Sequence, residues 1–314
     1  MSERIQVEQI VPVEAGIDRL DRMAALVFPE FSRSRLQQWI ASGELTVDGR
    51  SWRARDKVKG GERLRIDAQQ AVLTAEPESM ALDVVYEDEA LIVVNKPANL
   101  VVHPGAGHAT GTLMNGLLGL APELGALPRA GIVHRLDQHT TGLMVVARTD
   151  LARNRLVRAL AERDIARIYD GIVTGLVDKE GSVDAAIGRH PVARTRMTIR
   201  RDGKSAVTRY SVVERFRYHT RLRLALETGR THQIRVHMQH IGFPMLGDPV
   251  YGGGSRVRLD GPVQQVVQGF MRQALHACEL SLEHPMTGDA MRWRAPLHDD
   301  MLDLRDRLAA DADL

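Results

Sequence analysis

The spacing of hydrophobic residues near the start of the chain changes twice, and each change predicts a new element. Apolar residues recur at helical spacing over residues 17–27, and a second such run lies between Ser32, its predicted N-cap, and Gly43. Strand-like segments then flank a tight turn at Asp48-Gly49 and another at Gly60-Gly61. This pattern predicts a small unit of two helices followed by strands.

The regular pattern of this first unit covers residues 14–67 and then fades. Residues 68–81 lack periodicity and include Pro77, so we expect a linker there. A chain of 314 residues is long enough for two domains. We therefore predict a first domain at residues 14–75 and a second domain at residues 82–314.

The second domain contains helical and strand-like segments, with strands in the majority. Helices are expected at residues 113–120 and 151–160. Strands are expected at residues 91–97, 143–147, 166–175, 207–216 and 222–228. Because several of these strands follow one another like hairpins, the pattern predicts an α+β fold with a mixed, mostly antiparallel sheet.

Composition excludes some classes of protein. The apolar fraction of 44% is typical of a folded chain, and 42 basic residues stand against 40 acidic ones, for a net charge of +2. A single cysteine, Cys278, excludes an internal disulfide, and no apolar run approaches the roughly 20 residues that cross a membrane. Since no secretory leader is recognisable either, we expect a soluble cytoplasmic protein, with monomer as the default state.

Motifs of several common chemistries are absent from the sequence. The glycine-rich segment at residues 103–111 follows a strand, but it lacks the G-x-G-x-x-G spacing, so we expect it to line a site without binding a dinucleotide. No Walker A or G-x-S-x-G motif occurs, which argues against phosphoryl transfer and serine hydrolysis. His232, His237 and His240 lack a metal-binding spacing, because residues 232 and 237 of one helix project about 140° apart. We therefore expect these histidines to be hydrogen-bonded or to face RNA, and we expect no metal site.

Basic residues gather at two places where they could contact phosphate. Arg33 and Arg35 flank a predicted helix start, where backbone N–H groups also attract anions. From Arg189 to Arg209, seven Lys or Arg residues stand against one acidic residue, and a predicted hairpin turn at Asp202-Gly203 brings Lys204 with it. The alternative is a solvated charged face, but a basic hairpin beside a site favours contact with nucleic acid.

One carboxylate is the main candidate for chemistry. Asp137, in GIVHRLDQHTTGLMVVART, lies between apolar stretches, where a charged group is costly unless a partner holds it ionised. From the residues alone, Asp137 either has a structural role, capping a turn or pairing with Arg135, or is catalytic. Arg235, in TGRTHQIRVHMQHIG, could pair with it and keep its pKa low. Tyr169 offers a flat ring on a strand, and His134 beside Arg135 offers a polar group that could enter a nucleic-acid helix.

The first unit resembles the S4 RNA-binding module. The resemblance lies in SRSRLQQWIASGELTVDG and in the glycine-containing turn before RLRI. That family commonly has Asn where Asp48 stands here, a difference that affects a turn. The resemblance implies that this unit binds RNA, whereas the alternative is a small capping domain with solvated basic faces.

The second domain resembles the RluA/RluD family of RNA pseudouridine synthases, motif by motif and in order. The matching segments are LIVVNKPANLVVHPG, HRLDQHTTGLMVVART, RIYDGIVTG, TGRTHQIRVHMQHIGFPMLGDPVYGG and LHACELSLEHP. By position, Asp137 matches the catalytic aspartate, Tyr169 the tyrosine that stacks on the target base, and Arg235 the arginine paired with the aspartate. Arg135 matches the residue that helps to displace the base. The family often has Lys-Asp where this chain has Gln138-His139, which leaves the rest of the motif intact.

The resemblance implies that the protein isomerises uridine to pseudouridine in RNA. The uridine would be flipped into a pocket, its N1–C1′ bond broken, and C5 joined to C1′, without cofactor or metal. Asp137 could attack C1′, add to C6 or take the C2′ proton. Likeness to the RluD branch implies a stem-loop of 23S ribosomal RNA as the target, free or in an assembling large subunit. The alternatives are a non-catalytic RNA-binding or ribosome-assembly protein, and a synthase that acts on tRNA or another rRNA site.

Overall fold

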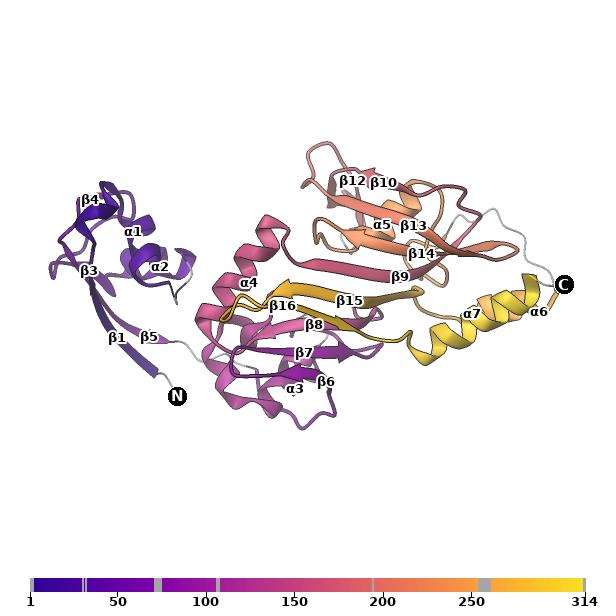
Figure 1. Ribbon diagram of the computed structural model, residues 1–314, viewed down its shortest axis with the longest axis horizontal. Coiled ribbons are helices and arrows are strands. Elements are labelled where there is room, and N and C mark those ends of the chain that lie inside the picture. Colours follow the sequence, from indigo (N-terminus) through magenta and orange to yellow (C-terminus); the bar gives the residue numbers. More distant parts are fainter. Residues whose placement is uncertain are drawn as a thin grey trace.

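The computed structural model describes residues 3–29, 31, 33–70, 75–105, 108–193, 195–253 and 261–312. It contains a small N-terminal unit at one end of the molecule and a larger body built around one long sheet (Figure 1). The predicted N-cap Ser32 lies outside the described residues. Within the described ranges, no helix is both long and apolar enough to cross a bilayer.

The first unit packs two helices against a three-stranded sheet. Its strands, in the order β1-β5-β3, lie at Glu3–Ile10, Arg63–Gln70 and Leu45–Val47. The helices are α1 (Leu20–Val27) and α2 (Arg33–Ser42), and a further pair of short strands joins β2 (Asp18–Arg19) to β4 (Lys57–Val58). The predicted inward residues are buried in its core, namely Leu36, Trp39, Ile40, Leu64 and Ile66.

The N-terminal boundary of this unit differs from the prediction. Because β1 pairs with β5 along its whole length, the unit begins at Glu3 and not at residue 14. The first helix begins at Leu20, since residues 18–19 pair with β4 and leave Ile17 64% exposed. The predicted Asp48-Gly49 turn has φ of 48° and 75°, as a type I′ turn requires, but the strand expected after it is reduced to an isolated bridge.

Nine strands form the sheet of the second unit, in the order β10-β13-β14-β9-β15-β8-β7-β6, with β16 paired to β15. They lie at Asp83–Glu87 (β6), Leu91–Lys96 (β7), Thr141–Ala147 (β8), Ala166–Thr174 (β9), Gly181–Asp184 (β10), Val207–Arg215 (β13), His219–Leu226 (β14), Leu275–Glu283 (β15) and Ala290–Arg294 (β16). Only β15 and β8 pair in parallel within this sheet. The predicted α+β fold with a mixed, mostly antiparallel sheet is confirmed.

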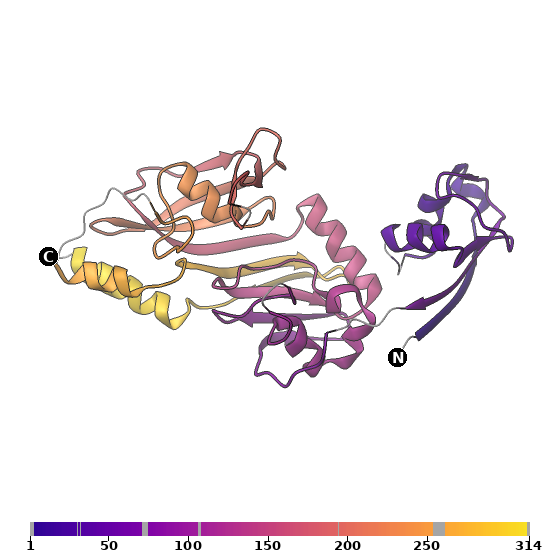
Figure 2. The ribbon, with the colours of Figure 1, turned by 180° about the vertical axis from the view of Figure 1, so that it is seen from behind.

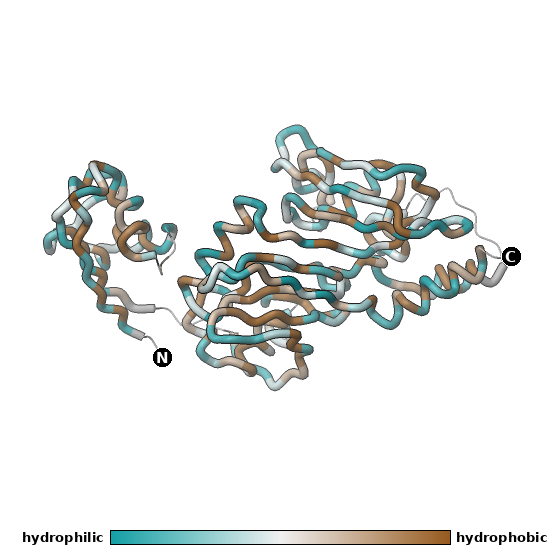
Figure 3. The backbone as a smooth tube through the Cα atoms, viewed as in Figure 1, coloured by the Kyte–Doolittle hydropathy of each residue, from teal (hydrophilic) through white to brown (hydrophobic). Residues whose placement is uncertain are grey.

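Helices cover both faces of this sheet (Figures 1 and 2). We call one face the front face: it packs against α3 (Leu113–Leu120), α5 (Gln233–His240) and the short 3₁₀ turns at Pro122–Ala126 and Pro128–Gly131. The back face packs against α4 (Asp150–Glu162), α6 (Gly261–Gly269) and α7 (Asp299–Ala312). The central strands are therefore hydrophobic along most of their length, whereas the outer loops are largely hydrophilic (Figure 3).

The predicted linker at residues 68–81 is shorter in the structure. Its first three residues belong to β5, and its last part is fixed on α3. Glu78 N–H donates to Asn115 O at 3.0 Å, and Asn115 Nδ2 donates to Glu76 O at 2.8 Å. Gly119 permits this contact, because a Cβ there would lie 2.1 Å from Glu78 O.

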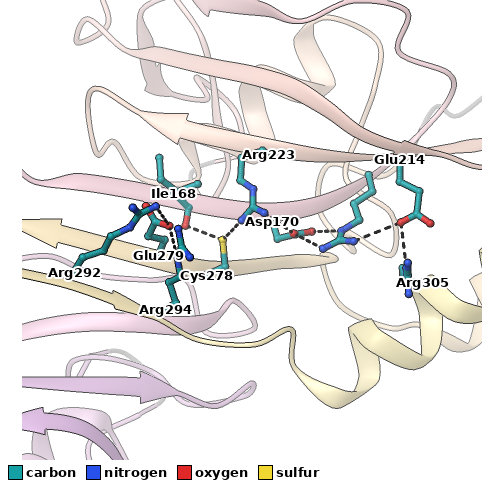
Figure 4. Close-up of polar contacts among 10 residues, drawn as sticks. Ile168, Asp170, Glu214, Arg223, Cys278, Glu279, Arg292, Arg294 and Arg305 are labelled. Carbon is teal, nitrogen blue, oxygen red and sulfur yellow. Dashed lines mark hydrogen bonds and ion pairs between the residues drawn. The ribbon is translucent and has the colours of Figure 1, made fainter.

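A chain of ion pairs crosses the back face between its two apolar clusters (Figure 4). Arg221 binds the buried Asp170 through two hydrogen bonds of 2.8 Å and reaches Glu214 at 3.4 Å, which also binds Arg305 of α7 at 3.1 Å. The position of these arginines follows from the alternation of apolar and polar residues in the strand predicted at residues 222–228. The leucines of β14 enter the front core, so its arginines point to the back face.

The basic stretch from Arg189 to Arg209 does not form the predicted hairpin. β11 (Ile187–Arg189) pairs with β12 (Met197–Ile199), and Lys204 returns to bridge the first residue of β11 on its other side. The Asp202-Gly203 turn therefore leads the chain from β12 to Lys204 and does not join two long basic arms.

Gly142 permits the one parallel contact of the sheet. Its φ is 114°, and a Cβ there would lie 2.3 Å from the carbonyl oxygen of Ala277 in β15. We expect Gly142→Ala to lower the melting temperature by at least about 5 °C, because backbone must move. Gly253→Ala is the control, since nothing lies within 4 Å of its Cβ position. Equal melting temperatures for the two variants in thermal unfolding would contradict this account.

His219 should make the protein less stable in acid. Neither ring nitrogen of this buried residue has a hydrogen-bond partner, and burial lowers its pKa to about 4. Between that pH and about 6.5 the unfolded chain binds the extra proton, so the free energy of unfolding falls as the pH falls through this window. His219→Phe removes this effect. In denaturant titrations, the free energy of unfolding of the variant relative to that of wild type should rise by about 2 kcal/mol as the pH is lowered from 7 to 5. No such rise would refute the assignment.

Candidate active site

A cleft of about 350 Å³ opens on the front face, where β9, the loop before β8 and the segment before α5 meet. Asp137 is the one carboxylate among its described lining residues. Five arginines line it as well, at positions 129, 135, 167, 230 and 235. This excess of positive charge favours a polyanionic ligand. The predicted glycine-rich segment reaches the cleft through His103.

Arg235 joins Asp137 to a second carboxylate. Its Nη1 donates to Asp137 Oδ2 at 2.9 Å, while Nε and Nη2 donate to the two oxygens of Asp248 at 2.7 and 2.8 Å. Burial would lower the pKa of Arg235, but the two carboxylates raise it overall, so the guanidinium stays charged. Burial would likewise raise the pKa of Asp248, and Arg235 outweighs that effect and lowers it. The pairing of Asp137 with Arg235 that the sequence predicted is present, and Asp137 remains 17% exposed at the cleft.

His232 brings a second nitrogen group near the carboxylate. It stands at the N-cap of α5 with φ of 56°, a left-handed conformation that is uncommon for a residue other than glycine. Its Nδ1 shares a hydrogen bond of 2.8 Å with the Tyr251 hydroxyl, and its Nε2 lies 3.9 Å from Asp137 Oδ1. The Tyr251 ring also lies beneath the Arg235 guanidinium, 5.0 Å from its centroid. Tyr251 therefore supports both groups that approach Asp137.

Buried side chains fix the loop that carries Asp137. The contacts are Lys96 Nζ to Gln138 O at 3.0 Å, Arg272 Nη1 to His139 O at 3.1 Å and Gln273 Nε2 to Thr140 Oγ1 at 3.0 Å. Burial lowers the pKa of Lys96 to about 7, and the negative charge of Asp137 acts against this shift. The backbone after Asp137 is therefore held in place by the fold itself.

Tyr169 forms part of the cleft wall on β9. Its side chain points to the front face and is only 5% exposed. Burial raises the pKa of its hydroxyl to about 12, so the ring is a neutral phenol. Asp137 and Tyr169, which are 32 positions apart in the sequence, thus line one cleft, as the resemblance implied.

The two residues before Leu136 have different surroundings. Arg135 is exposed and lines the cleft, a position from which it can reach a ligand. His134 was also expected to enter a nucleic-acid helix, but its Nε2 accepts a hydrogen bond of 3.0 Å from the Val145 N–H of β8. Burial lowers the pKa of His134 to about 3, so the ring is neutral. The structure corrects this expectation, because His134 positions the loop against the sheet.

The remaining predicted RNA contacts lie outside the cleft lining. Arg33 is 2.6 Å from Asp21 within the first unit and keeps part of its side chain exposed. Arg35 lies 3.6 Å from Asp150 at the start of α4, so it links the two units. Lys204 is exposed beside β11. The structure therefore does not bring these three basic residues together with Asp137.

The other two histidines considered for a metal site are separate from His232. His237 is buried and contacts Thr208 Oγ1 and Ala185 O, each at 2.9 Å. His240 is exposed at the end of α5. His237 therefore fastens α5 to the neighbouring strands.

Comparisons with known proteins agree with this geometry. Residues 90–240 match the family model described as RNA pseudouridylate synthase. The chain is 52% identical over 317 residues to Ribosomal large subunit pseudouridine synthase D of Pseudomonas aeruginosa, covering 99% of this chain and 98% of that protein. It is 48% identical over 315 residues to the protein of the same name from Escherichia coli strain K12, covering 99% and 97%.

The chain belongs to the RNA pseudouridylate synthase family. Solved structures agree with this assignment. Human RNA Pseudouridylate Synthase Domain Containing 4 is 25% identical with a TM-score of 0.59 and covers 72% of this chain and 92% of its own. Human RNA Pseudouridylate Synthase Domain Containing 1 is 26% identical with a TM-score of 0.54 and covers 70% and 86%. Both human proteins therefore share the fold in which the cleft of this chain is built.

Sequence reasoning missed two residues of the synthase that hold Arg235. Asp248 and Tyr251 lie in GDPVYGG, a segment that was matched to the family but given no role. An aspartate four residues before a glycine pair resembles an ordinary turn residue. Only the fold reveals that Asp248 is buried and receives the Val250 and Tyr251 N–H groups at 2.9 Å.

We expect Asp248→Asn to reduce turnover of the synthase at least about 10-fold. The amide cannot accept two charged hydrogen bonds, so Arg235 loses its fixed orientation towards Asp137. Asp67→Asn is the matched control, because Asp67 accepts two hydrogen bonds from Arg4 on the exposed surface of the first unit. Rates would be measured on saturating RNA after circular dichroism has verified folding. Turnover of Asp248→Asn equal to that of the control would contradict the prediction.

Proposed function

We propose that this synthase isomerises uridine to pseudouridine in large-subunit ribosomal RNA, with Asp137 as the reacting carboxylate. The observation that carries the proposal is the 2.9 Å ion pair of Asp137 and Arg235 in a cleft that Tyr169 also lines. The pair holds the carboxylate in a fixed direction, and the cleft volume suits one small ligand group. Full-length relatives named Ribosomal large subunit pseudouridine synthase D support the choice of RNA.

The target uridine leaves its helix before it reacts. Arg135 occupies the space that the base vacates, and the flipped base stacks on the ring of Tyr169. Unstacking costs a few kcal/mol, which stacking on the ring and phosphate contacts to the other cleft arginines offset. The reaction then breaks N1–C1′ and joins C5 to C1′. Asp137 acts on C1′, on C6 or on the C2′ proton, and all three routes need it ionised and within reach of the ribose or base.

The first unit adds RNA contacts away from the cleft. It carries the S4-like pattern, and the exposed part of Arg33 faces solvent beside the α2 start. Lys204 adds a basic contact near β11. The substrate that we propose is a stem-loop of 23S rRNA, bound by a monomer in the cytoplasm, either as free RNA or in an assembling large subunit. This division gives affinity to the phosphate contacts and selectivity to the base pocket.

Asp137→Asn should lower isomerisation by at least about 1,000-fold while folding and RNA affinity persist, since the amide keeps the shape and loses the charge. Tritium release from RNA labelled at uridine C5 measures the product directly. Asp164→Asn is the control, because Asp164 is exposed between α4 and β9.

The choice of RNA separates the alternatives. Wild-type enzyme would be compared on 23S rRNA fragments, on other rRNA segments and on tRNA transcripts. Release from a 23S fragment that needs Asp137 supports the proposal. Binding without release would favour a non-catalytic RNA-binding protein, and preference for tRNA would overturn the proposed substrate.

A further inference from the structure

Arg167 is a buried arginine that has no hydrogen-bond or ion-pair partner among the described residues. It is 7% exposed, and no ion pair or hydrogen bond joins it to any residue in the described part of the chain. Its Nε is fully buried and unsatisfied. The other buried arginines differ in this respect, since Arg235 binds Asp137 and Asp248 and Arg272 binds Asp300 at 2.6 Å. Arg167 therefore lacks the anion that the fold supplies to its counterparts.

The position of Arg167 places its charge inside the cleft. It lines the cleft on β9, two residues before Tyr169 and on the same face of the strand. Its Nη1 lies so close to Gly229 that a Cβ there would be 2.7 Å away. Its positive charge also acts on the His134 ring and the Tyr169 hydroxyl, so the guanidinium lies near both groups. Asp137, the one carboxylate among the described lining residues, is already paired with Arg235.

Such an arrangement is unfavourable in the free protein. A buried charge without a partner costs several kcal/mol, so a site that retains one is adapted to an anion that arrives later. The neighbouring ring on the same strand is the one on which we stack the flipped base. Because Arg167 lies beside this ring, the anion that it would bind is on the base of the nucleotide and not on its phosphate.

The proposed reaction produces an anion at that place. When N1–C1′ breaks, the bonding electron pair stays with the base, and negative charge spreads from N1 to the carbonyl oxygens O2 and O4. If Asp137 adds to C6 instead, the electron pair of the C5–C6 double bond moves onto O4. When C5 bonds to C1′, the electron pair of the base forms the new bond. Any bond that Asp137 has made to C1′ or C6 breaks with its electron pair returning to the carboxylate, and a proton taken from C2′ is returned there. C5 then loses its proton and N1 gains one, so atoms and electrons balance and no oxidant is needed.

Resting on the proposed function, we propose that Arg167 is a further catalytic residue whose guanidinium hydrogen-bonds a carbonyl oxygen of the anionic uracil. The interaction strengthens as charge develops and is weaker with the neutral base, so it accelerates the chemical step more than binding. Because every route open to Asp137 places charge on the uracil oxygens, the role of Arg167 does not depend on which route operates.

The first test separates chemistry from binding. Arg167→Met keeps an unbranched apolar side chain in place of the aliphatic part of arginine and removes the guanidinium with its charge. We expect the single-turnover rate to fall about 100-fold, while the dissociation constant for RNA changes less than about threefold. Arg167→Lys should recover part of the rate. Arg163→Met is the matched control, since Arg163 is exposed just before β9 and pairs with Glu227 outside the cleft.

A second substrate tests the nature of the charge. Fluorine at C5 withdraws electrons and stabilises the uracil anion, so this substrate needs less help from a cation. RNA with 5-fluorouridine at the target should therefore show a rate loss for Arg167→Met at least about fivefold smaller than uridine RNA does. C5 of this substrate carries fluorine and no proton, so water adds at C6 after C5 has joined C1′. Chromatography of nuclease digests follows this rearranged, hydrated fluorinated nucleoside. An equal loss on both substrates would overturn the proposal.

Stability distinguishes this role from a structural one. Removing an unpaired buried charge should leave the melting temperature unchanged or higher, whereas removal of a structural arginine would lower it.

Weaker RNA binding with an unchanged rate would indicate a phosphate contact and overturn the proposal. Wild-type turnover and its loss in Asp137→Asn are measured in the same assay. If these hold and Arg167→Met keeps its rate, only the inference about Arg167 fails, whereas an inactive wild type would overturn both.

Discussion

The guanidinium of Arg235 binds two carboxylates at once, and the position of Asp137 depends on this contact. A lone exposed ion pair contributes little and does not fix geometry. Here Asp248 is buried, receives two backbone N–H groups and takes two of the guanidinium nitrogens, so the direction of the third is determined. The cleft therefore presents a carboxylate that is paired with a guanidinium, partly exposed and held still before RNA arrives.

The sheet separates two uses of charged residues. On the back face, Arg221 and Arg305 are matched to carboxylates, and the pairs join α7 to the strands (Figure 4). In the cleft of the front face, five arginines gather around the one carboxylate among the described lining residues and leave positive charge unmatched. Because alternate residues of β9 and β14 point to opposite faces, the same strands build both arrangements. The first face stabilises the fold, and the second is prepared for a polyanion.

Much of the second unit could be predicted from the sequence, for physical reasons. The helix at residues 113–120 and the strand at 91–97 are strongly apolar runs of the right length, and both appear within a residue of their predicted bounds. β1 was missed because Ile5 and Val7 are only partly buried in a strand rich in charge, so its alternation is weak. The hairpin predicted at Asp202-Gly203 was misjudged because turn residues do not reveal which strands they connect.

The site divides in the same way. The pairing of Asp137 with Arg235 joins residues 98 positions apart, and chain order alone could not have selected it over a contact with Arg135. Linked motifs shared with a family made that selection. His134 was misplaced because a sequence does not say which side of a loop faces the sheet. Asp248, Tyr251 and the unmatched charge of Arg167 become apparent only when burial and partners are known.

The docking of Glu76 and Glu78 on α3 has a consequence for how RNA would be captured. Only four residues, 71–74, separate the end of β5 from Ala75, so these two points can be at most about 18 Å apart. A nucleic acid held by the first unit is thus tethered within a small volume around the second. Its encounter with the cleft becomes intramolecular, with an effective concentration of the order of millimolar. The short connection between the two units, more than any added contact, would then decide which part of a folded RNA is modified.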